Sequence, residues 1–368
     1  MCTEKVSSDL MGDAKRAVIA MSGGVDSAVA AHLLKEAGYD VLGITLRMFD
    51  PAILTPDGRT AYGDSDPIRD ARDACDRLGI PHRAIDASDA FRRSVIEPFI
   101  DTYCTGGTPN PCITCNRCLK FGYLSEVAQS LGYPYLATGH YSKIERSEDG
   151  RYLLRLANDP KKDQTYMLWS LTQEQLSHVL FPLGGMEKSE VREIARSIGF
   201  TAANKKDSQD ICFIPDGDYA AFIMRDTGRT FKSGAFIDRD GKPLGMHKGI
   251  IHYTVGQRKG LGIALGEPMY VAEKNVSDNT VRLVRNEELF SKTLEVTSAN
   301  LMLWDKLDSP VRVQAKVRYH HAPAWATVTQ IADDRLHVEF DEPVRAIAKG
   351  QSFVMYVDDY LAGGGIIS

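Results

Sequence analysis

Short runs of hydrophobic residues alternate with amphipathic segments over the first 140 residues of the chain. Ala17 to Met21 is a run of five apolar residues, and the Ala- and Leu-rich segment from Ala28 to Lys35 is typical of a helix. The alternation continues and predicts further strands at 41–46, 81–85 and 131–137 and further helices at 68–78 and 90–103. Strands that alternate with helices form a parallel sheet covered on both faces. We therefore expect an α/β fold with a doubly wound parallel sheet, whose ligand lies at the carboxyl ends of the strands.

Two further segments in the first 200 residues carry local signals. Residues 50–67 are polar and rich in Pro, Gly and Asp, which predicts a long loop. Ser189 to Ile198 is predicted as a helix, with Ser189 as its N-cap and Gly199 as its stop.

The pattern changes after Phe213. Asp238 to Gly241 is a hairpin turn signal, and a glycine-dense run from Gly245 to Gly266 follows it. From Leu294 onward, short alternating strands recur roughly every ten residues, for example at 311–319, 326–331 and 335–340. This spacing predicts a small antiparallel β-barrel. We therefore expect three domains, at residues 1–218 (the parallel sheet), 219–290 (a small β-rich domain) and 291–368 (the barrel).

The composition is that of an ordinary globular chain. Of its 368 residues, 43% are hydrophobic and 25% are charged. Residues 1–15 carry charges of both signs without an apolar core, so we expect no secretory signal, and no run of about 18 apolar residues predicts a membrane span. The net charge of −5 argues weakly against a nucleic-acid partner, whereas local basic pairs such as Arg258 with Lys259 leave room for one.

The cysteines change this picture. There are seven, an odd number, and they cluster in a chain without an expected signal peptide. This usage indicates thiol or metal chemistry in a reducing cytosol. The cysteines are Cys2, Cys75, Cys104, Cys112, Cys115, Cys118 and Cys212.

The string from Ser22 to Ser27 lies between the first predicted strand and the first predicted helix. Gly23 and Gly24 let the backbone approach a phosphate, and the free amides of the helix start favour an anion. No lysine follows the glycines, so this is not the P-loop of many nucleotide-binding proteins. Asp26 stands there instead, and a carboxylate beside phosphates indicates a Mg²⁺ ion between them. The alternative is a glycine-rich turn without a ligand.

This string, Ser-Gly-Gly-x-Asp-Ser, resembles the PP-loop of the ATP pyrophosphatase family. The resemblance implies cleavage of ATP between its α and β phosphates and activation of an oxygen as its adenylate. Leu46 and Gly139 fall at the carboxyl ends of other predicted strands, which agrees with a nucleotide crevice at that edge.

The densest cysteine segment begins a predicted helix that runs from Pro111 to Ser130. Cysteines in a first helical turn feel the positive end of the helix dipole, so a lowered thiol pKa is expected. Cys112 and Cys115 are three residues apart and can point into one pocket, whereas Cys118 lags behind on that face. Two metal interpretations compete. An iron–sulfur run would need a fourth cysteine, and structural zinc would need a second C-x₂-C pair.

Several further motifs occur in one order along residues 17–367, and together with the PP-loop they resemble the bacterial tRNA-specific 2-thiouridylases. The motifs are Thr-Pro-Asn-Pro-x-x-x-Cys-Asn, Ala-Thr-Gly-His-Tyr, Lys-Asp-Gln, Lys-Asp-Ser-x-x-Ile-Cys-Phe-Ile, Gly-Gln-Arg-Lys-Gly-Leu-Gly-Ile, Phe-Asp-Glu-Pro-Val and Gly-Gly-Gly-Ile-Ile.

The resemblance implies a role for each matching position. Cys115 would be the nucleophile and Cys212 the carrier of a persulfide. The implied ATP-binding residues are Ala20, Met21, Ser22, Gly23, Gly24, Val25, Asp26, Ser27, Leu46 and Gly139. The target base would meet Asn110, Pro111 and Cys112. The implied tRNA contacts are His140, Lys162, Asp163, Gln164, Arg318, Tyr319 and Gln351.

The resemblance also implies the reaction, its cofactors and its partners. ATP, with Mg²⁺, would adenylate O2 of the wobble uridine of tRNA, and sulfur from the persulfide would replace that oxygen. A cysteine desulfurase or a sulfur-relay protein would supply the sulfur in the cytoplasm. The alternatives from other classes are a PP-loop ligase or amidotransferase-type enzyme acting on a small molecule, and a tRNA-binding module without catalysis.

One position departs from the family pattern. Many family members have aspartate directly after Asn-Pro, where this chain has Cys112. The change adds a third thiol near Cys115 and Cys212. Three thiolates could hold a four-iron–four-sulfur cluster with one open iron, which is an alternative to the persulfide route.

Overall fold

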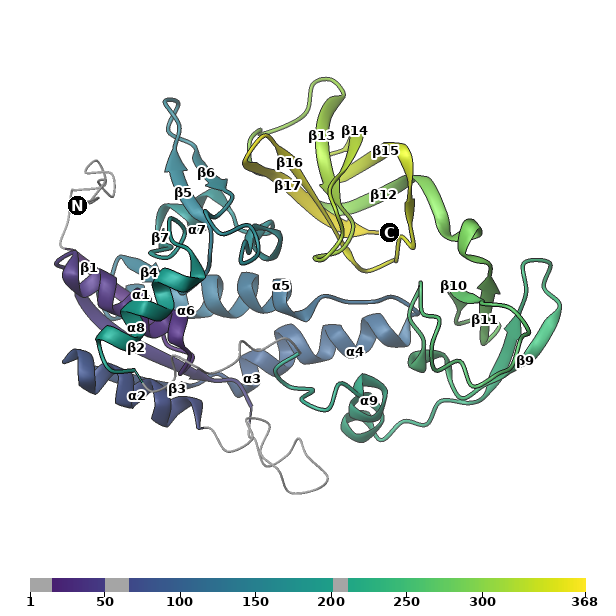
Figure 1. Cartoon of the computed structure of the whole chain (residues 1–368), viewed down its shortest axis with the longest axis horizontal. Helices are drawn as coiled ribbons and strands as arrows, with labels where there is room; N and C mark the ends of the chain where they lie inside the picture. The colour runs from purple at the N-terminus through teal and green to yellow at the C-terminus, as the bar shows by residue number, and fades with distance from the viewer. Residues whose placement is uncertain (1–14, 50–65, 201–210) are drawn as a thin grey trace.

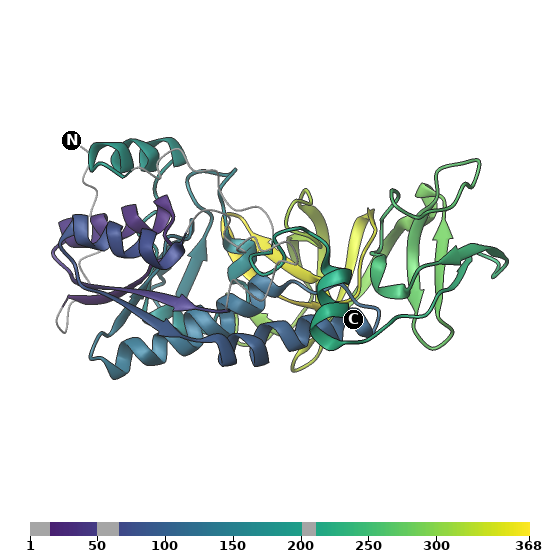
Figure 2. The same ribbon diagram turned by 90° about the horizontal axis from the view of Figure 1, so that it is seen from below.

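The structure is a computed structural model that describes residues 15–49, 66–200 and 211–368. Figure 1 shows a helix-covered parallel sheet at one end of the molecule and a β-barrel in the middle. At the other end lies a small sheet, which we call the central sheet because its strands come from the middle of the sequence. The same order is visible from below in Figure 2. No helix within these described ranges is long and apolar enough to cross a membrane.

The parallel sheet has five strands in the order β3-β2-β1-β4-β7. Side chains of β1 alternate between its faces, so Ala17 and Ile19 pack in one hydrophobic cluster and Val18 packs in another. Helices therefore cover both faces, which confirms the predicted doubly wound α/β fold. The strands are β1 (Arg16–Ala20), β2 (Asp40–Arg47), β3 (His82–Asp86), β4 (Tyr135–Ala137) and β7 (Val179–Leu180). The helices α1 (Val25–Glu36), α2 (Pro67–Leu78) and α8 (Lys188–Ser197) share one cluster.

Two long helical segments of this region each contain a π-helical stretch. The first joins α3 (Ser88–Phe91) to α4 (Glu97–Cys104) through residues Arg92–Ile96. The second joins α5 (Pro111–Cys115) to α6 (Leu124–Ser130) through residues Asn116–Tyr123. The predicted helices 90–103 and 111–130 are therefore confirmed, whereas the π-helical stretches were not predicted.

Several predicted boundaries differ from those of the structure. The strand expected at 131–137 begins only at Tyr135, because Gly132 has a left-handed backbone (φ 77°) and Pro134 has no amide to donate. Helix α8 is capped by Glu187, which forms a capping box with Glu190, rather than by Ser189. Most of the loop expected at 50–67 lies outside the described residues, and Pro67 already belongs to α2.

The central sheet and the barrel follow in the second half of the chain. The central sheet is β8 (Gly234–Ile237), β9 (Pro243–His247), β10 (Tyr270–Asn275) and β11 (Thr280–Val284), in the order β10-β11-β8-β9, preceded by α9 (Tyr219–Thr227). The barrel is β12 (Phe290–Leu301), β13 (Val311–Lys316), β14 (Ala324–Ala332), β15 (Arg335–Arg345), β16 (Ser352–Val357) and β17 (Tyr360–Ile367). Pairing of β12 with β17 closes the barrel, which confirms the predicted antiparallel barrel.

An additional hairpin of the parallel-sheet region pairs with a strand of the barrel. Strands β5 (Lys143–Arg146) and β6 (Tyr152–Arg155) pair with each other, and β6 pairs with β17 where Arg155 meets Tyr360. The short helix α7 (Gln173–Ser177) follows this hairpin. Strand β13 ends at Lys316, three residues before the predicted end, so Arg318 and Tyr319 lie in a turn.

Candidate active site

The PP-loop, residues 22–27, lies between the carboxyl ends of β1 and β4, where the order of the sheet reverses. Two glycines make this arrangement possible. Gly23 has φ 72°, and a Cβ atom there would lie 2.8 Å from the carbonyl oxygen of Pro67. A Cβ atom on Gly139, in the loop after β4, would lie 2.8 Å from the carbonyl carbon of Asp26 and 2.9 Å from the amide of Ser27. The two loops therefore touch through backbone.

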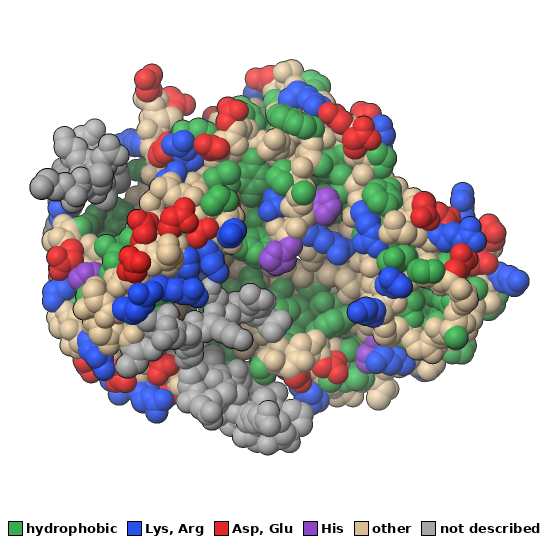
Figure 3. Space-filling view, in the orientation of Figure 1, with side chains coloured by type: hydrophobic (Ala, Val, Ile, Leu, Met, Phe, Trp, Pro, Cys, Tyr) green, Lys and Arg blue, Asp and Glu red, His purple; other side chains and the backbone are tan. Residues whose placement is uncertain are grey.

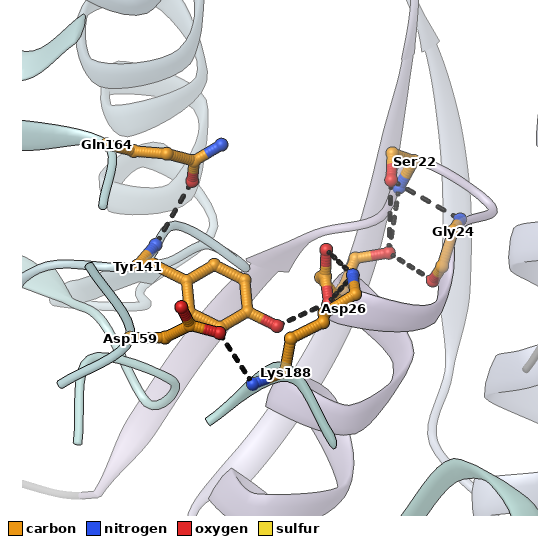
Figure 4. A network of polar contacts seen from close by, with 8 residues as sticks. Ser22, Gly24, Asp26, Tyr141, Asp159, Gln164 and Lys188 are labelled. Carbon is orange, nitrogen blue, oxygen red and sulfur yellow. Dashed lines mark hydrogen bonds and ion pairs between the residues drawn. The ribbon is translucent and has the colours of Figure 1, made fainter. Parts of the chain in front are cut away.

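Two serine side chains fix the shape of the PP-loop. Ser27 Oγ accepts a hydrogen bond from the amide of Ser22 at 3.2 Å and donates to the carbonyl of Gly24 at 3.0 Å. Ser22 Oγ accepts from the amide of Gly24 at 3.3 Å. Gly24 is the N-cap of α1 and has no side chain to cover the first helical amides. The loop is therefore shaped before any ligand arrives, and its amides suit an anion (Figure 4).

Asp26 is held by an ion pair that sequence reasoning missed. Lys188 Nζ lies 2.7 and 2.8 Å from the two carboxylate oxygens of Asp26, and the Tyr141 hydroxyl donates to Oδ1 at 2.8 Å (Figure 4). The Lys188 side chain is only 8% exposed, whereas that of Asp26 is 31% exposed. The argument that the carboxylate requires Mg²⁺ was therefore incomplete, because an ammonium group already compensates it. No local signal marks Lys188, which lies 162 residues away.

The catalytic cysteines expected from the sequence, Cys115 and Cys212, lie near each other and near Cys112. Cys112 and Cys115 lie on α5, and electrostatic interactions connect both sulfurs with Cys212. Cys115 is buried, Cys118 is half-buried, and Cys112 and Cys212 are exposed. The six cysteines that the structure describes are all free thiols, and Cys2 lies outside the described residues.

The thiols of Cys112, Cys115 and Cys212 have raised pKa values, so the expected lowering by the helix dipole was wrong. Burial raises the pKa of Cys115 to about 11 and that of Cys212 to about 12. Burial also raises the pKa of Cys112. Although Cys112 and Cys212 expose part of their surface, the chain displaces water around the sulfurs, and the sulfurs oppose each other's ionisation. The thiols are therefore protonated at neutral pH.

Lys120 is a cation near these thiols, and sequence reasoning missed it as well. Its charge lowers the pKa of Cys112, Cys115 and Cys212 against the larger effect of burial. In a regular α-helix, residues five apart point about 140° away from each other, so Lys120 and Cys115 would lie on different faces. Lys120 lies in the π-helical stretch Asn116–Tyr123, where hydrogen bonds join residues five apart, and its charge acts on all three of these sulfurs.

His140 also lies near Lys120. Its ring is packed 5.7 Å from Phe121 and 5.8 Å from Phe181, and Nδ1 is 2.7 Å from the hydroxyl of Thr138. Burial lowers the pKa of His140 well below its ordinary value, and Lys120 adds to this effect. The imidazole is therefore neutral and buried, so the tRNA contact expected for it stays a prediction that this packing does not favour.

The other residues expected to contact tRNA make contacts within the chain. Asp163 is near Tyr319, whose hydroxyl donates to the Asp163 carbonyl at 3.0 Å. Gln164 Oε1 accepts from the amide of Tyr141 at 3.1 Å, which links it to the ATP side. Arg318 donates 2.8 Å hydrogen bonds to carbonyls on two different segments, and Gln351 bonds to the loop before α5. Lys162, which directly precedes Asp163 in the chain, is half-buried.

The residues expected at the target base open the catalytic helix. Asn110 is the N-cap of α5, and its amide nitrogen lies 3.9 Å from the sulfur of Met167. Pro111 is the first helical residue, and Cys112 follows it. These positions are adjacent to Cys115, as the motif implied.

The iron–sulfur alternative is not supported. Among the residues that the structure describes, no group of three or more His, Cys, Asp or Glu side chains is arranged to hold a metal ion. The arrangement of the described side chains therefore gives no support to the three-cysteine cluster that the sequence left open.

Comparisons with known proteins cover almost the whole chain. A family profile described as "tRNA methyl transferase HUP domain" matches residues 15–216. Profiles described as "tRNA methyl transferase PRC-barrel domain" and "Aminomethyltransferase beta-barrel domain" match residues 221–285 and 291–367.

Curated relatives share the name tRNA-specific 2-thiouridylase MnmA. The protein from Clostridioides difficile (strain 630) is 48% identical over 355 residues, which are 96% of this chain and 98% of that protein. The protein from Clostridium acetobutylicum is 47% identical over 353 residues, which are 96% of this chain and 99% of that protein. Among solved structures, a 4-thiouridine synthetase–RNA complex with bound ATP has 18% identity and a TM-score of 0.34, covering 58% of this chain and 50% of that chain, which is too slight to support an argument.

Proposed function

The chain belongs to the family of tRNA-specific 2-thiouridylases, and on this basis we propose how its site transfers sulfur to a uridine of tRNA. The substrates are tRNA, ATP and a protein-bound persulfide. The products are 2-thiouridine at the wobble position, AMP and pyrophosphate. The observation that carries the proposal is that the PP-loop and the cysteine pair lie in one region, linked through the loop 138–141.

The ATP side would activate the uridine. The amides of Gly23, Gly24 and the start of α1 bind the phosphates, with the hydroxyls of Ser22 and Ser27 fixing the loop. O2 of the uridine attacks the α-phosphorus, the bond to the β-phosphate oxygen breaks, and pyrophosphate leaves. Lys188 adds positive charge beside this loop through its pair with Asp26. The part-exposed Asp26 carboxylate fits a Mg²⁺ ion, which would screen the phosphate charge when bound.

The sulfur side would release the sulfur that replaces the oxygen. The Cys115 thiol loses its proton and attacks the inner sulfur of the Cys212 persulfide, so that a Cys115–Cys212 disulfide forms and hydrosulfide leaves. Hydrosulfide attacks C2 of the adenylated uridine, and AMP departs with the oxygen. A cellular dithiol then reduces the disulfide. Lys120 would stabilise the Cys115 thiolate and the hydrosulfide ion, because its ammonium charge acts on both Cys115 and Cys212.

The tRNA surface and the domain boundaries remain predictions. Figure 3 shows Lys and Arg side chains around a hollow on the face between the parallel-sheet region and the barrel, which suits a phosphate backbone. Cytoplasmic location and sulfur supply by a cysteine desulfurase or relay protein follow from the proposed substrates. The boundaries near residues 218 and 290 also stay predictions.

The decisive experiment combines nucleoside analysis with reconstitution. Cells that lack the protein should lose 2-thiouridine from their tRNA, and the gene should restore it. Purified protein with ATP, tRNA and a cysteine desulfurase with L-cysteine should form AMP only when tRNA is present. AMP formation without tRNA, driven by a small molecule, would instead identify a small-molecule ligase.

A further inference from the structure

The loop between α4 and α5, residues 105–110, lies where the three parts of the molecule meet. We name it the junction loop. In Figure 1 it runs from the far end of α4 back to α5, between the central sheet and the barrel, and Figure 2 shows the same position from below. Its last residue, Asn110, is the N-cap of the helix that carries Cys115. Any shift of the loop therefore moves the start of the catalytic helix.

Two glycines let the junction loop pass between its neighbours. Gly106 has φ 84°, and a Cβ atom there would lie 3.2 Å from Cγ2 of Val276, next to β10 of the central sheet. A Cβ atom on Gly107 would lie 2.7 Å from Cγ2 of Thr102 and 3.4 Å from the carbonyl oxygen of Lys349, in the barrel. The loop is thus enclosed from both sides, and its backbone groups need partners from the surrounding parts.

Those partners come from outside the parallel-sheet region. Lys274 Nζ, on β10, donates to the carbonyl of Gly107 at 3.1 Å. Gln351 Nε2, in the barrel, donates to the carbonyls of Thr108 at 2.9 Å and Pro109 at 3.3 Å. The amide of Thr108 donates to the carbonyl of Lys349 at 2.8 Å. Three consecutive carbonyls directly before Asn110 are therefore held by two side chains from two other parts of the fold.

The ammonium group of Lys274 lies between the junction loop and an aromatic ring of α4. Its ammonium group lies 5.6 Å from the centre of the Tyr103 ring, at the end of α4. Burial lowers the pKa of Lys274 to about 8. Withdrawing part of an ammonium group from water costs free energy, and the hydrogen bond to the Gly107 carbonyl and the contact with the Tyr103 ring act against that cost. Both hydrogen bonds that the Gln351 side chain donates also go to carbonyls of this loop.

We propose that Lys274 and Gln351 are positioning residues of the thiolation reaction, which hold the junction loop so that Asn110 and Pro111 meet the target base. The central sheet and the barrel thereby act on the chemistry through backbone carbonyls rather than through tRNA alone. This inference rests on the proposed function. It assigns Gln351 a role within the chain, beyond the tRNA contact that the family resemblance implies.

The first test compares Lys274→Met with the matched control Lys242→Met, an exposed lysine of the central region. Methionine keeps most of the apolar stem and removes the donor. At saturating ATP and tRNA, kcat of Lys274→Met should fall about ten- to a hundredfold, because small misplacements at a reacting centre cost about that much. KM for tRNA should stay within about twofold, and Lys274→Arg should restore most of the rate. The control should behave like the parent protein.

The second test needs no substrate and therefore separates this inference from the proposed function. Hydrogen exchange of a peptide that covers residues 105–110 should be about fivefold faster in Lys274→Met and in Gln351→Leu, since each loses a hydrogen bond to the loop. The PP-loop peptide should not change. If the parent protein makes no 2-thiouridine, the proposed function fails while this readout still stands.

The outcomes are separable. A fall in kcat with faster exchange and unchanged KM for tRNA supports the positioning role. Three results would overturn it: exchange that equals the parent, unchanged kcat despite faster exchange, or a loss confined to tRNA affinity. A thermal midpoint of Lys274→Met within a few degrees of the parent shows that the variant is folded, and Lys274→Arg covers the case in which it is not.

Discussion

The two halves of the candidate site are prepared in opposite ways. On the ATP side, polar groups already have partners, and the Asp26 carboxylate is paired with Lys188 before any ligand binds. On the sulfur side, the thiols of Cys115 and Cys212 are protonated, because the surrounding chain raises their pKa values to about 11 and about 12. Among the residues that the structure describes, Lys120 is the cation that lowers the pKa values of Cys112, Cys115 and Cys212.

This difference suits two different chemical tasks. The phosphates of ATP are already charged when ATP binds, so a preorganised loop can bind them without rearranging. A thiolate or persulfide that waited in an ionised form would react with oxidants and stray electrophiles. Keeping the thiols protonated until substrate and sulfur donor arrive protects them, at the cost of a slower sulfur step.

The largest effect should come from removing a thiol or the loop carboxylate. Cys115→Ser and Cys212→Ser should each lower thiolation by at least about a thousandfold, because serine cannot carry or release sulfur. Both should still bind tRNA and release pyrophosphate. Asp26→Ala should stop pyrophosphate release while Cys212 can still be loaded with persulfide. Mass spectrometry of the persulfide and a pyrophosphate assay measure the two halves, and near-normal thiolation by either serine variant would contradict its role.

The next effect concerns the ion pair on the ATP side. Lys188→Met leaves the Asp26 carboxylate beside the phosphates without its ammonium partner, so pyrophosphate release should fall about a hundredfold. Persulfide loading of Cys212 should not change. Lys188→Arg should restore part of the rate, and Lys242→Met is the matched control. Equal losses in both halves would show that the site does not divide as described.

A smaller effect is expected from Lys120→Met on the sulfur side. Loss of the ammonium removes the charge that lowers the thiol pKa values, so hydrosulfide release should slow by about tenfold at neutral pH. Pyrophosphate release should stay unchanged, and Lys120→Arg should recover activity.

The pH dependence gives an independent check on the same half. Because the pKa of Cys115 is raised, the thiolate fraction, and with it the rate of sulfur release, should rise about tenfold per pH unit from pH 6.5 to 8.5. A rate that is flat across this window would mean that Cys115 already reacts as a thiolate.

The sequence predicted the elements of both halves better than their electrostatics. The strand–glycine–helix pattern located the PP-loop correctly because its geometry depends on neighbouring residues. Lys188 was out of reach, because its contact with Asp26 is made across the fold by residues 162 positions apart. The direction of the thiol pKa shift was wrong for a related reason. The helix start was visible in the sequence, whereas the burial that outweighs the dipole is a property of the packed chain.

Backbone irregularities limited the remaining predictions. The π-helical stretch that contains Lys120 has no signature in the residue pattern, and nothing in the sequence marked this lysine as a neighbour of the thiols. Strand β13 ends before Arg318, which the pattern had extended through Tyr319. The resemblance to a family supplied candidate tRNA contacts, but it did not show that these side chains also bond to other parts of the chain.

The smallest effect should come from Arg318, which lies outside both halves. Its guanidinium donates 2.8 Å hydrogen bonds to the carbonyls of Val255 and Ala346, and so connects the segment before the central strand β10 with the barrel. Arg318→Met should therefore lower the thermal midpoint by a few degrees, since two hydrogen bonds from a charged donor are lost.

Because Arg318 is also expected at the tRNA backbone, affinity for every substrate tRNA should fall a few-fold. The slope of log affinity against log salt should become shallower by about one. Pyrophosphate release and sulfur release should decline together at subsaturating tRNA and recover together at saturation. A salt slope equal to that of the parent would limit Arg318 to its contacts within the chain, and a loss in one half alone would tie it to that half.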